Sequence, residues 1–199
     1  MYIAFDTETS GLHAECQILT AHFIILDENF KELDSYNLKL KHKLYKIEAK
    51  AMTINKIDLV KHDISAVTVN MARNSFLVML RKYNKRLIPI GHNVSFDLRF
   101  LKKSGLLTDI EFNQYISSNV LDTMNIAQYL KACRVIPEYQ SLSLKNLCHF
   151  YNIELENDEL HTAEYDIKIT IELLKRFIKL LSSEQKDTLT KKRKVSAVE

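Results

Sequence analysis

Two carboxylates near the N-terminus, Asp6 and Glu8, lie two residues apart and directly follow the apolar residues 2–5. Side chains of a strand alternate between its two faces, so a strand here places both carboxylates on one face at its C-terminal end. Carboxylates this close repel each other unless a cation neutralises them, and Mg²⁺ and Mn²⁺ prefer oxygen ligands. The pair therefore predicts a divalent-metal site, although Asp-x-Glu alone is more often a solvated strand end.

Two further carboxylates lie at the starts of expected helices. Asp97 ends the segment GHNVSFD, in which a buried strand leads into a helix that Asn93 is expected to cap. Asp166 ends HTAEYD, in which Thr162 is the expected N-cap and His161 precedes the helix. Each residue taken singly has a structural explanation, because acids stabilise the first turn of a helix and a lone His there is commonly a capping or surface residue. The conjunction of four acids and a histidine is what indicates chemistry.

The segments DTETSGL, GHNVSFD and HTAEYD resemble, in this order, the three exonuclease motifs of the DnaQ-like (DEDDh) 3′-to-5′ exonucleases. This family includes DNA polymerase III proofreading (epsilon-like) exonuclease domains and ribonuclease T. The resemblance covers residues 2 to about 180, including INKID at 54–58, where Lys56 stands in a position that is often Gly in relatives. Related DEDDy enzymes carry Tyr four residues before the last Asp; here that position is Thr162, and His161 matches the histidine class.

The resemblance implies a two-metal-ion enzyme that removes nucleoside 5′-monophosphates from single-stranded or frayed 3′ ends. Asp6 would bridge two Mg²⁺ (or Mn²⁺) ions, Glu8 and Asp166 would help to hold the first ion, and Asp97 would serve the second. His161 would be the general base, because imidazole exchanges a proton near neutral pH. These five residues form the expected catalytic set.

The same resemblance implies four contacts to the terminal nucleotide, at Thr9, Gly11, Leu12 and Asn93. A pocket that closes around the last nucleotides requires a single strand or a frayed end, because paired and stacked bases cannot enter it. DNA is slightly favoured over RNA, since the motifs most resemble proofreading domains, and RNA 3′-end trimming is the alternative. A non-catalytic module that binds nucleic acid or a polymerase is less expected, because it needs neither four acids nor a base at these spacings.

The remaining sequence supplies the elements that must position these residues. The β-rich segments 2–7, 18–27 and 32–40 predict three consecutive strands, and short apolar runs predict two more at 87–90 and 119–122. Helical patterns cover residues 65–84, the segment from 93, 123–132, 142–151 and 162–181. With the resemblance, this order predicts an α/β, ribonuclease H-like fold. Its sheet is five-stranded and mixed, three antiparallel strands plus two parallel, with flanking helices.

Length and composition predict one domain over residues 1–181 and a basic, disordered tail over 182–199. The tail holds five of the 28 Lys/Arg and three of the 25 Asp/Glu, which leaves 23 basic and 22 acidic residues in the domain. A nearly neutral domain does not grip long duplexes by charge alone and suits a pocket that binds an end. The three cysteines are an odd number without a Cys-x-x-Cys pair, so neither a disulfide framework nor a zinc site is expected.

The expected partner is the 3′ end of a nucleic acid, as single-stranded DNA or RNA. A DNA polymerase or its clamp is a further candidate, since QKDTL at 185–189 faintly resembles a clamp-binding peptide, and a homodimer is a candidate assembly. No apolar run approaches the roughly 18 residues that a membrane span needs, so we expect a cytoplasmic protein without membrane contact. The basic run from Lys191 to Val195 resembles a nuclear import signal, which makes a nuclear location the alternative.

Overall fold

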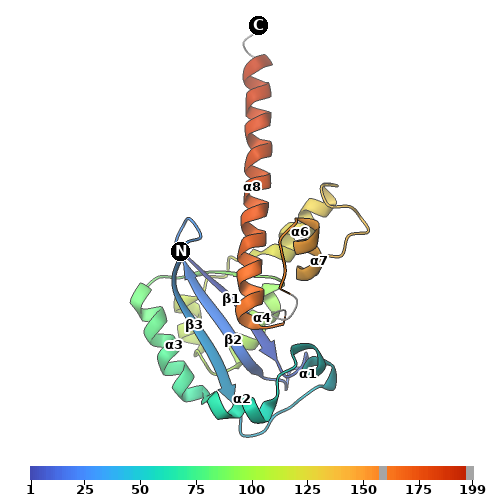
Figure 1. Ribbon diagram of the computed structural model, residues 1–199. Coiled ribbons are helices and arrows are strands. Elements are labelled where there is room, and N and C mark those ends of the chain that lie inside the picture. The colour runs from blue at the N-terminus through green and yellow to red at the C-terminus, as the bar shows by residue number, and fades with distance from the viewer. Residues whose placement is uncertain (157–160, 196–199) are drawn as a thin grey trace.

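The computed structural model describes residues 1–156 and 161–195, with side chains described as far as Ser182. The strands form one sheet in the order β4-β3-β2-β1-β5-β6 (Figure 1). Neighbouring strands among β1, β2 and β3 are antiparallel, β5 runs parallel to β1, and β6 runs parallel to β5. The five predicted strands are present, and a short β4 adds a parallel edge beside β3. Their bounds are β1 Tyr2–Thr9, β2 Ile18–Leu26, β3 Glu32–Lys41, β4 Val67–Thr68, β5 Ile88–Gly91 and β6 Leu121–Asp122.

Eight helices lie within the described residues, and three of them were not predicted from the sequence. The unpredicted helices α1, α2 and α5 have seven residues each, too few for a helical period to show. Local caps define two of them: Asp58 accepts the N–H groups of Val60 and Lys61 in α2, and Thr108 and Glu111 form a capping box in α5. The bounds are α1 Ala49–Asn55, α2 Leu59–Ser65, α3 Val69–Tyr83, α4 Val94–Lys103, α5 Asp109–Tyr115, α6 Thr123–Ala132, α7 Leu144–Phe150 and α8 Ala163–Val195.

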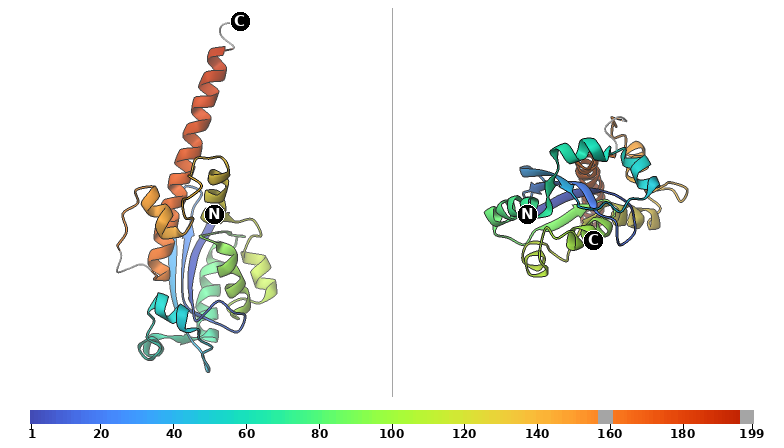
Figure 2. Two further views of the ribbon diagram at one scale, coloured as in Figure 1. Left: turned by 90° about the vertical axis from the view of Figure 1, so that its right-hand side faces the viewer. Right: turned by 90° about the horizontal axis from the view of Figure 1, so that it is seen from below.

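The sheet is covered by helices on both faces, and the alternation of β1 decides which residue meets which layer. Ile3 and Phe5 belong to the larger core, which includes Phe76 of α3 and residues of α4. Ala4, which points to the opposite face, packs in a second cluster with Ile167 of α8. Figure 2 shows α8 on one side of the strands and α3 and α4 on the other. Even-numbered residues of β1 therefore face α8.

The last helix extends well past the point where its apolar stripe ends. The first turns of α8 lie over the sheet, and the helix then projects away from the rest of the molecule (Figure 1). It runs to Val195, so residues 182–195 of the expected disordered tail are helical, while 196–199 lie outside the described residues. Residues 182–195 contain no Gly or Pro and include five Lys/Arg residues, so a helix nucleated against the sheet can propagate through them. The division into domain and tail at residue 181 stays a prediction.

No helix in the described part of the chain is both long and apolar enough to cross a membrane.

On the α3 and α4 side of the sheet, a shielded ion pair joins two helices. Nη1 and Nη2 of Arg73 on α3 each lie 2.7 Å from an oxygen of Glu111 on α5. Glu111 also accepts the Thr108 N–H at 2.9 Å. The hydrogen bond from Arg73 is the main reason that the pKa of Glu111 falls from 4.5 to about 2.

Replacing this carboxylate tests the link between α3 and α5. Glu111→Gln should lower the free energy of unfolding by about 1–2 kcal/mol near neutral pH, because it removes a charge-assisted hydrogen bond. The pKa of Glu111 is depressed in the folded state, so its stabilisation is complete above 4.5 and is lost as the pH falls toward 2. Urea unfolding at about pH 7 and about pH 3 should therefore give a smaller difference at the lower pH. The exposed Glu28→Gln is the control, and an equal loss at both pH values would contradict the ion pair.

Candidate active site

Three of the predicted acids meet where β1 ends beneath the start of α8. Asp6 and Glu8 share the strand face of Ala4, opposite His22 and Thr20 of β2, and so point toward α8. Asp166 lies in the first turn of that helix. Oxygen atoms from Asp6, Glu8 and Asp166 all lie within 4.8 Å of one another. The structure thus brings together carboxylates that are far apart in the sequence. Glu8 of β1 and Asp166 of α8 are separated by 158 positions.

The electrostatics of this cluster favour a bound cation. Burial and then the neighbouring carboxylates raise the pKa of Glu8 to about 8 and hold the pKa of Asp6 well above its usual range. Burial also raises the pKa of Asp166, whose Oδ1 is buried without a hydrogen-bond partner. A divalent ion would neutralise the repulsion and occupy the open oxygen. The residues therefore fit a hard metal ion.

Asp97 approaches the cluster from the other side of β1. It is buried in the first turn of α4, where its Oδ1 accepts the Thr7 N–H at 3.0 Å and the Thr7 hydroxyl at 2.6 Å. Burial raises its pKa to about 7, and its charge is the largest neighbouring contribution to the raised pKa of Asp6. Asp97 is outside the group of three that lies within 4.8 Å. It is more than a helix-dipole partner, because it ties α4 to the strand that carries Asp6.

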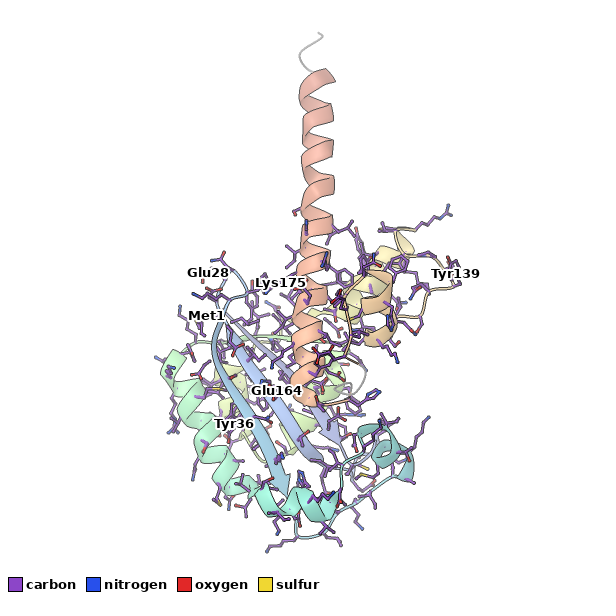
Figure 3. The ribbon with its side chains drawn as sticks, in the orientation of Figure 1. Met1, Glu28, Tyr36, Tyr139, Glu164 and Lys175 are labelled. Atoms are coloured by element: carbon purple, nitrogen blue, oxygen red, sulfur yellow. The ribbon has the colours of Figure 1, made fainter. Side chains whose placement is uncertain are left out.

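His161 lies immediately before α8, next to the cluster. Its backbone is left-handed, with φ at 68°, and its proximity to Asp166 partly offsets the rise that burial causes in the pKa of that carboxyl group. Thr162 is the N-cap, as predicted, because its hydroxyl accepts the Tyr165 N–H at 3.3 Å. His161 is exposed and lines a cleft of about 600 Å³ together with Glu8. Figure 3 shows the neighbouring Glu164 at this end of α8, over the sheet.

The chain turns sharply after β1, in the segment predicted to contact a nucleotide. The Thr9 hydroxyl donates to the carbonyl of Gly11 at 2.8 Å, and the Thr9 carbonyl accepts from the side chain of Asn55 at 3.0 Å. A Cβ on Gly11 would lie 2.5 Å from the sulfur of Cys16 and 2.5 Å from the carboxyl carbon of Glu48. Only glycine fits at this position, because the turn packs closely against Cys16 and Glu48.

A second, smaller pocket lies on the other side of Glu8. It has a volume of about 200 Å³, and its apolar walls include Leu12, Ile54 and Phe96. Leu12 is 60% exposed. Glu8 lines both this pocket and the cleft that holds His161. The carboxylate cluster thus stands between a polar cleft and an apolar pocket.

Asn93 is the N-cap of α4, but its side chain makes no capping bond. Its backbone is left-handed, with φ at 64°, and the carboxylate of Asp122 caps the helix instead. Asp122 accepts the N–H groups of Asn93 and Val94 at 3.0 Å each, and that of Met124 at 2.9 Å. The expected side-chain cap is therefore wrong, and the physical reason is the competing charged acceptor at the end of β6.

Sequence reasoning missed several residues that hold the site together. Thr7, Asn55 and Asp122 each make a buried contact to it, and the sequence assigned none of them a role, although Asn55 lies in the segment INKID and Asp122 at a strand end before a helix. Lys56 is the left-handed C-cap of α1, with φ at 55°, in the position where relatives often have Gly. A glycine there would avoid the steric cost of that conformation.

Comparisons with known proteins agree with this geometry. The model of the exonuclease family matches residues 3–174. The chain is 25% identical over 196 residues to the PolC-type DNA polymerase III of Mycoplasma genitalium, covering 95% of this chain and 12% of that protein. The chain therefore spans about an eighth of the length of this curated relative.

Solved structures share the fold at low sequence identity. An E. coli exonuclease I structure with single-stranded DNA and a zinc ion superposes with a TM-score of 0.71 at 19% identity, covering 98% of this chain and 44% of that one. Cell-death related nuclease 4 gives a TM-score of 0.65 at 16% identity, over 90% and 64% of the two chains. The family match over nearly the whole domain, the order of the motifs and the three converging carboxylates lead to one conclusion. The chain belongs to the exonuclease family and is a DnaQ-like, metal-dependent 3′-to-5′ exonuclease domain.

Proposed function

We propose that this domain hydrolyses the last phosphodiester bond at a free 3′ end and releases a nucleoside 5′-monophosphate, using two Mg²⁺ or Mn²⁺ ions. The observation that carries the proposal is the group of Asp6, Glu8 and Asp166, whose oxygens lie within 4.8 Å of one another. Their raised pKa values indicate a site that is stable in its ionised form only with a cation. Such a group suits metal-assisted hydrolysis of a charged diester.

The four acids have distinct positions from which to hold the ions. Asp6 belongs to the group with Glu8 and Asp166, and the charge of Asp97 also raises its pKa, so it is the proposed ligand shared by both ions. Glu8 and Asp166 would complete the first site, and Asp97 would serve the second. Two bound ions supply a nucleophile at neutral pH and stabilise the charge on the attacked phosphate and the leaving oxygen. Thr7 keeps Asp97 in place by binding only its Oδ1.

His161 is the proposed general base. It is exposed at the edge of the cleft that Glu8 also lines, so a water between these residues is within its reach. The left-handed backbone at His161 and the Thr162 cap fix where the imidazole leaves α8. Carboxylates that bind a metal make poor proton acceptors, which leaves imidazole as the suitable group.

The small apolar pocket is the proposed site of the terminal nucleotide. Leu12 and Phe96 offer apolar surface for a base, and Thr9 also lines the pocket. The other two predicted contacts, Gly11 and the α4 N-cap Asn93, are not among the residues that line this pocket. The volume of about 200 Å³ has room for one base and not for a stacked pair, so the strand end must be single or frayed.

DNA is the proposed substrate, and RNA trimming is the alternative. The relative that this chain matches is a DNA polymerase, and one structural neighbour was solved with single-stranded DNA. By the same reasoning a DNA polymerase is the proposed partner, and the bacterial relative supports a cytoplasmic location. A non-catalytic module of the same fold would give no products in the assays below.

Two substitutions separate metal binding from proton transfer. With 3′-labelled single-stranded DNA and Mg²⁺, His161→Ala should lower kcat by about 10²–10⁴-fold, because it removes the base. It should leave the Mn²⁺-induced rise in Tm unchanged, since its side chain is not among the proposed metal ligands. Asp6→Asn should lose both activity and the Mn²⁺ effect on Tm.

The matched control is His149→Ala, an exposed histidine on α7. It should retain wild-type kcat. Wild-type protein that releases no mononucleotides with Mg²⁺ or Mn²⁺ would refute the proposed enzyme. A His161→Ala protein with wild-type kcat would refute only the role of the base.

The sugar preference is tested with DNA and RNA oligomers of the same sequence. We expect a higher kcat/KM for DNA, because binding of the terminal nucleotide is proposed to be tuned to deoxyribose, and the 2′-hydroxyl is the group that distinguishes RNA. Release of mononucleotides is measured for both oligomers under identical Mg²⁺. A higher kcat/KM for the RNA oligomer would refute the DNA proposal and favour RNA 3′-end trimming as the function.

A further inference from the structure

Glu48 occupies the N-cap position of α1 but does not cap that helix. Its Oε1 instead accepts the backbone N–H groups of Leu12 and His13, each at 3.0 Å. The thiol of Cys16 donates to the same oxygen at 3.2 Å. The Glu48 N–H in turn donates to the Ser10 carbonyl at 2.8 Å. One residue thus binds the turn after β1 at four points.

The opposite side of this turn is held through its carbonyl groups. Arg99 of α4 donates to the Leu12 carbonyl at 3.3 Å, and Lys103 donates to the Ala14 carbonyl at 2.7 Å. Arg99 also lies 5.3 Å from the ring centre of Phe96, a wall of the apolar pocket. The amides of the turn therefore face an anion on one side, and its carbonyls face two cations on the other.

Leu12 is the residue whose position depends on these bonds. With 60% of its surface exposed, its side chain has little packing of its own to fix it. Its N–H is bound by Glu48 and its carbonyl by Arg99, so the backbone alone sets where the side chain enters the pocket. Glu48 itself also lines that pocket.

We propose that Glu48 is a positioning residue, which holds Leu12 against the terminal nucleotide by binding the Leu12 and His13 amides. The proposal rests on the proposed function, because it assigns Glu48 a role in binding the 3′-terminal nucleotide. Glu48 touches none of the four acids in the described structure and so takes no part in the hydrolysis. Its loss weakens the substrate complex and spares the chemical step.

Steady-state kinetics on single-stranded DNA with Mg²⁺ test this role. Glu48→Ala should raise KM about tenfold and change kcat less than about twofold, because a misplaced contact costs binding while the metal site is intact. Glu48→Gln should restore a KM near that of wild type, since its amide oxygen can accept the same two N–H groups. Glu48→Asp keeps the charge but is one methylene shorter, so its KM should lie between those of wild type and Glu48→Ala. The exposed Glu138→Ala is the control with unchanged kinetics.

A double substitution asks whether Glu48 acts through Leu12. Leu12→Ala should raise KM by itself, and adding Glu48→Ala to it should raise KM little further, because both changes remove the same contact. Additive effects, an unchanged KM in Glu48→Ala, or a Glu48→Gln protein as weak as Glu48→Ala would each overturn the proposal. If Glu48→Ala does not fold, the KM values of Glu48→Gln and Glu48→Asp are compared instead. A KM near that of wild type in Glu48→Gln with a raised KM in Glu48→Asp would support the proposal, and the reverse would overturn it. An inactive wild-type protein would instead refute the proposed function.

Discussion

The rest of this structure depends on one electrostatic constraint, the packing of four carboxylates, three half-buried and one buried, into a small space. Asp6, Glu8 and Asp166 have oxygens within 4.8 Å of one another, and Asp97 is close enough to raise the pKa of Asp6. Like charges at this separation are unfavourable in a medium of low polarity, so the site must either bind protons or bind cations. A fold that keeps these carboxylates ionised without a cation would lose stability. The repulsion between the acids therefore indicates metal chemistry more strongly than their spacing in the sequence does.

The sheet solves the problem of bringing these acids together. The alternation of β1 sends Asp6 and Glu8 toward α8, while the intervening Thr7 points the other way and binds Asp97. One strand therefore collects an acid from each of the two flanking layers. The same strand leads directly into the turn at Gly11, so the metal site and the proposed nucleotide pocket share a single rigid element. The helices that cover the two faces of β1 pack against it in two hydrophobic clusters. The packing that stabilises the fold therefore also holds the site residues in place.

The sequence was sufficient to predict a five-stranded mixed sheet, the helices with a long apolar period and the placement of Asp6 and Glu8 on one face of a strand. Asp6 and Glu8 could be predicted because strand alternation is local, and the match of three ordered motifs supplied the partners. The contacts made by Thr7, Asn55 and Asp122 could not be predicted, since each joins segments that only the tertiary fold brings together. The helical conformation of residues 182–195 was missed for a different reason: helix propensity without an apolar stripe is a weak signal. Glu48 gave no sign of its role, because its partners lie 32 to 36 residues earlier.

Proton release on metal binding tests the central claim most directly. If the empty cluster holds protons, as the pKa of about 8 for Glu8 and about 7 for Asp97 indicate, then binding Mn²⁺ near pH 7 must displace them. Titration calorimetry in two buffers of different ionisation enthalpy gives the number released. The account predicts about one proton or more near pH 7 and a smaller number above about pH 9, where Glu8 and Asp97 are already ionised. Binding of Mn²⁺ without proton release near pH 7 would contradict it, because the carboxylates would then be ionised in the absence of any cation.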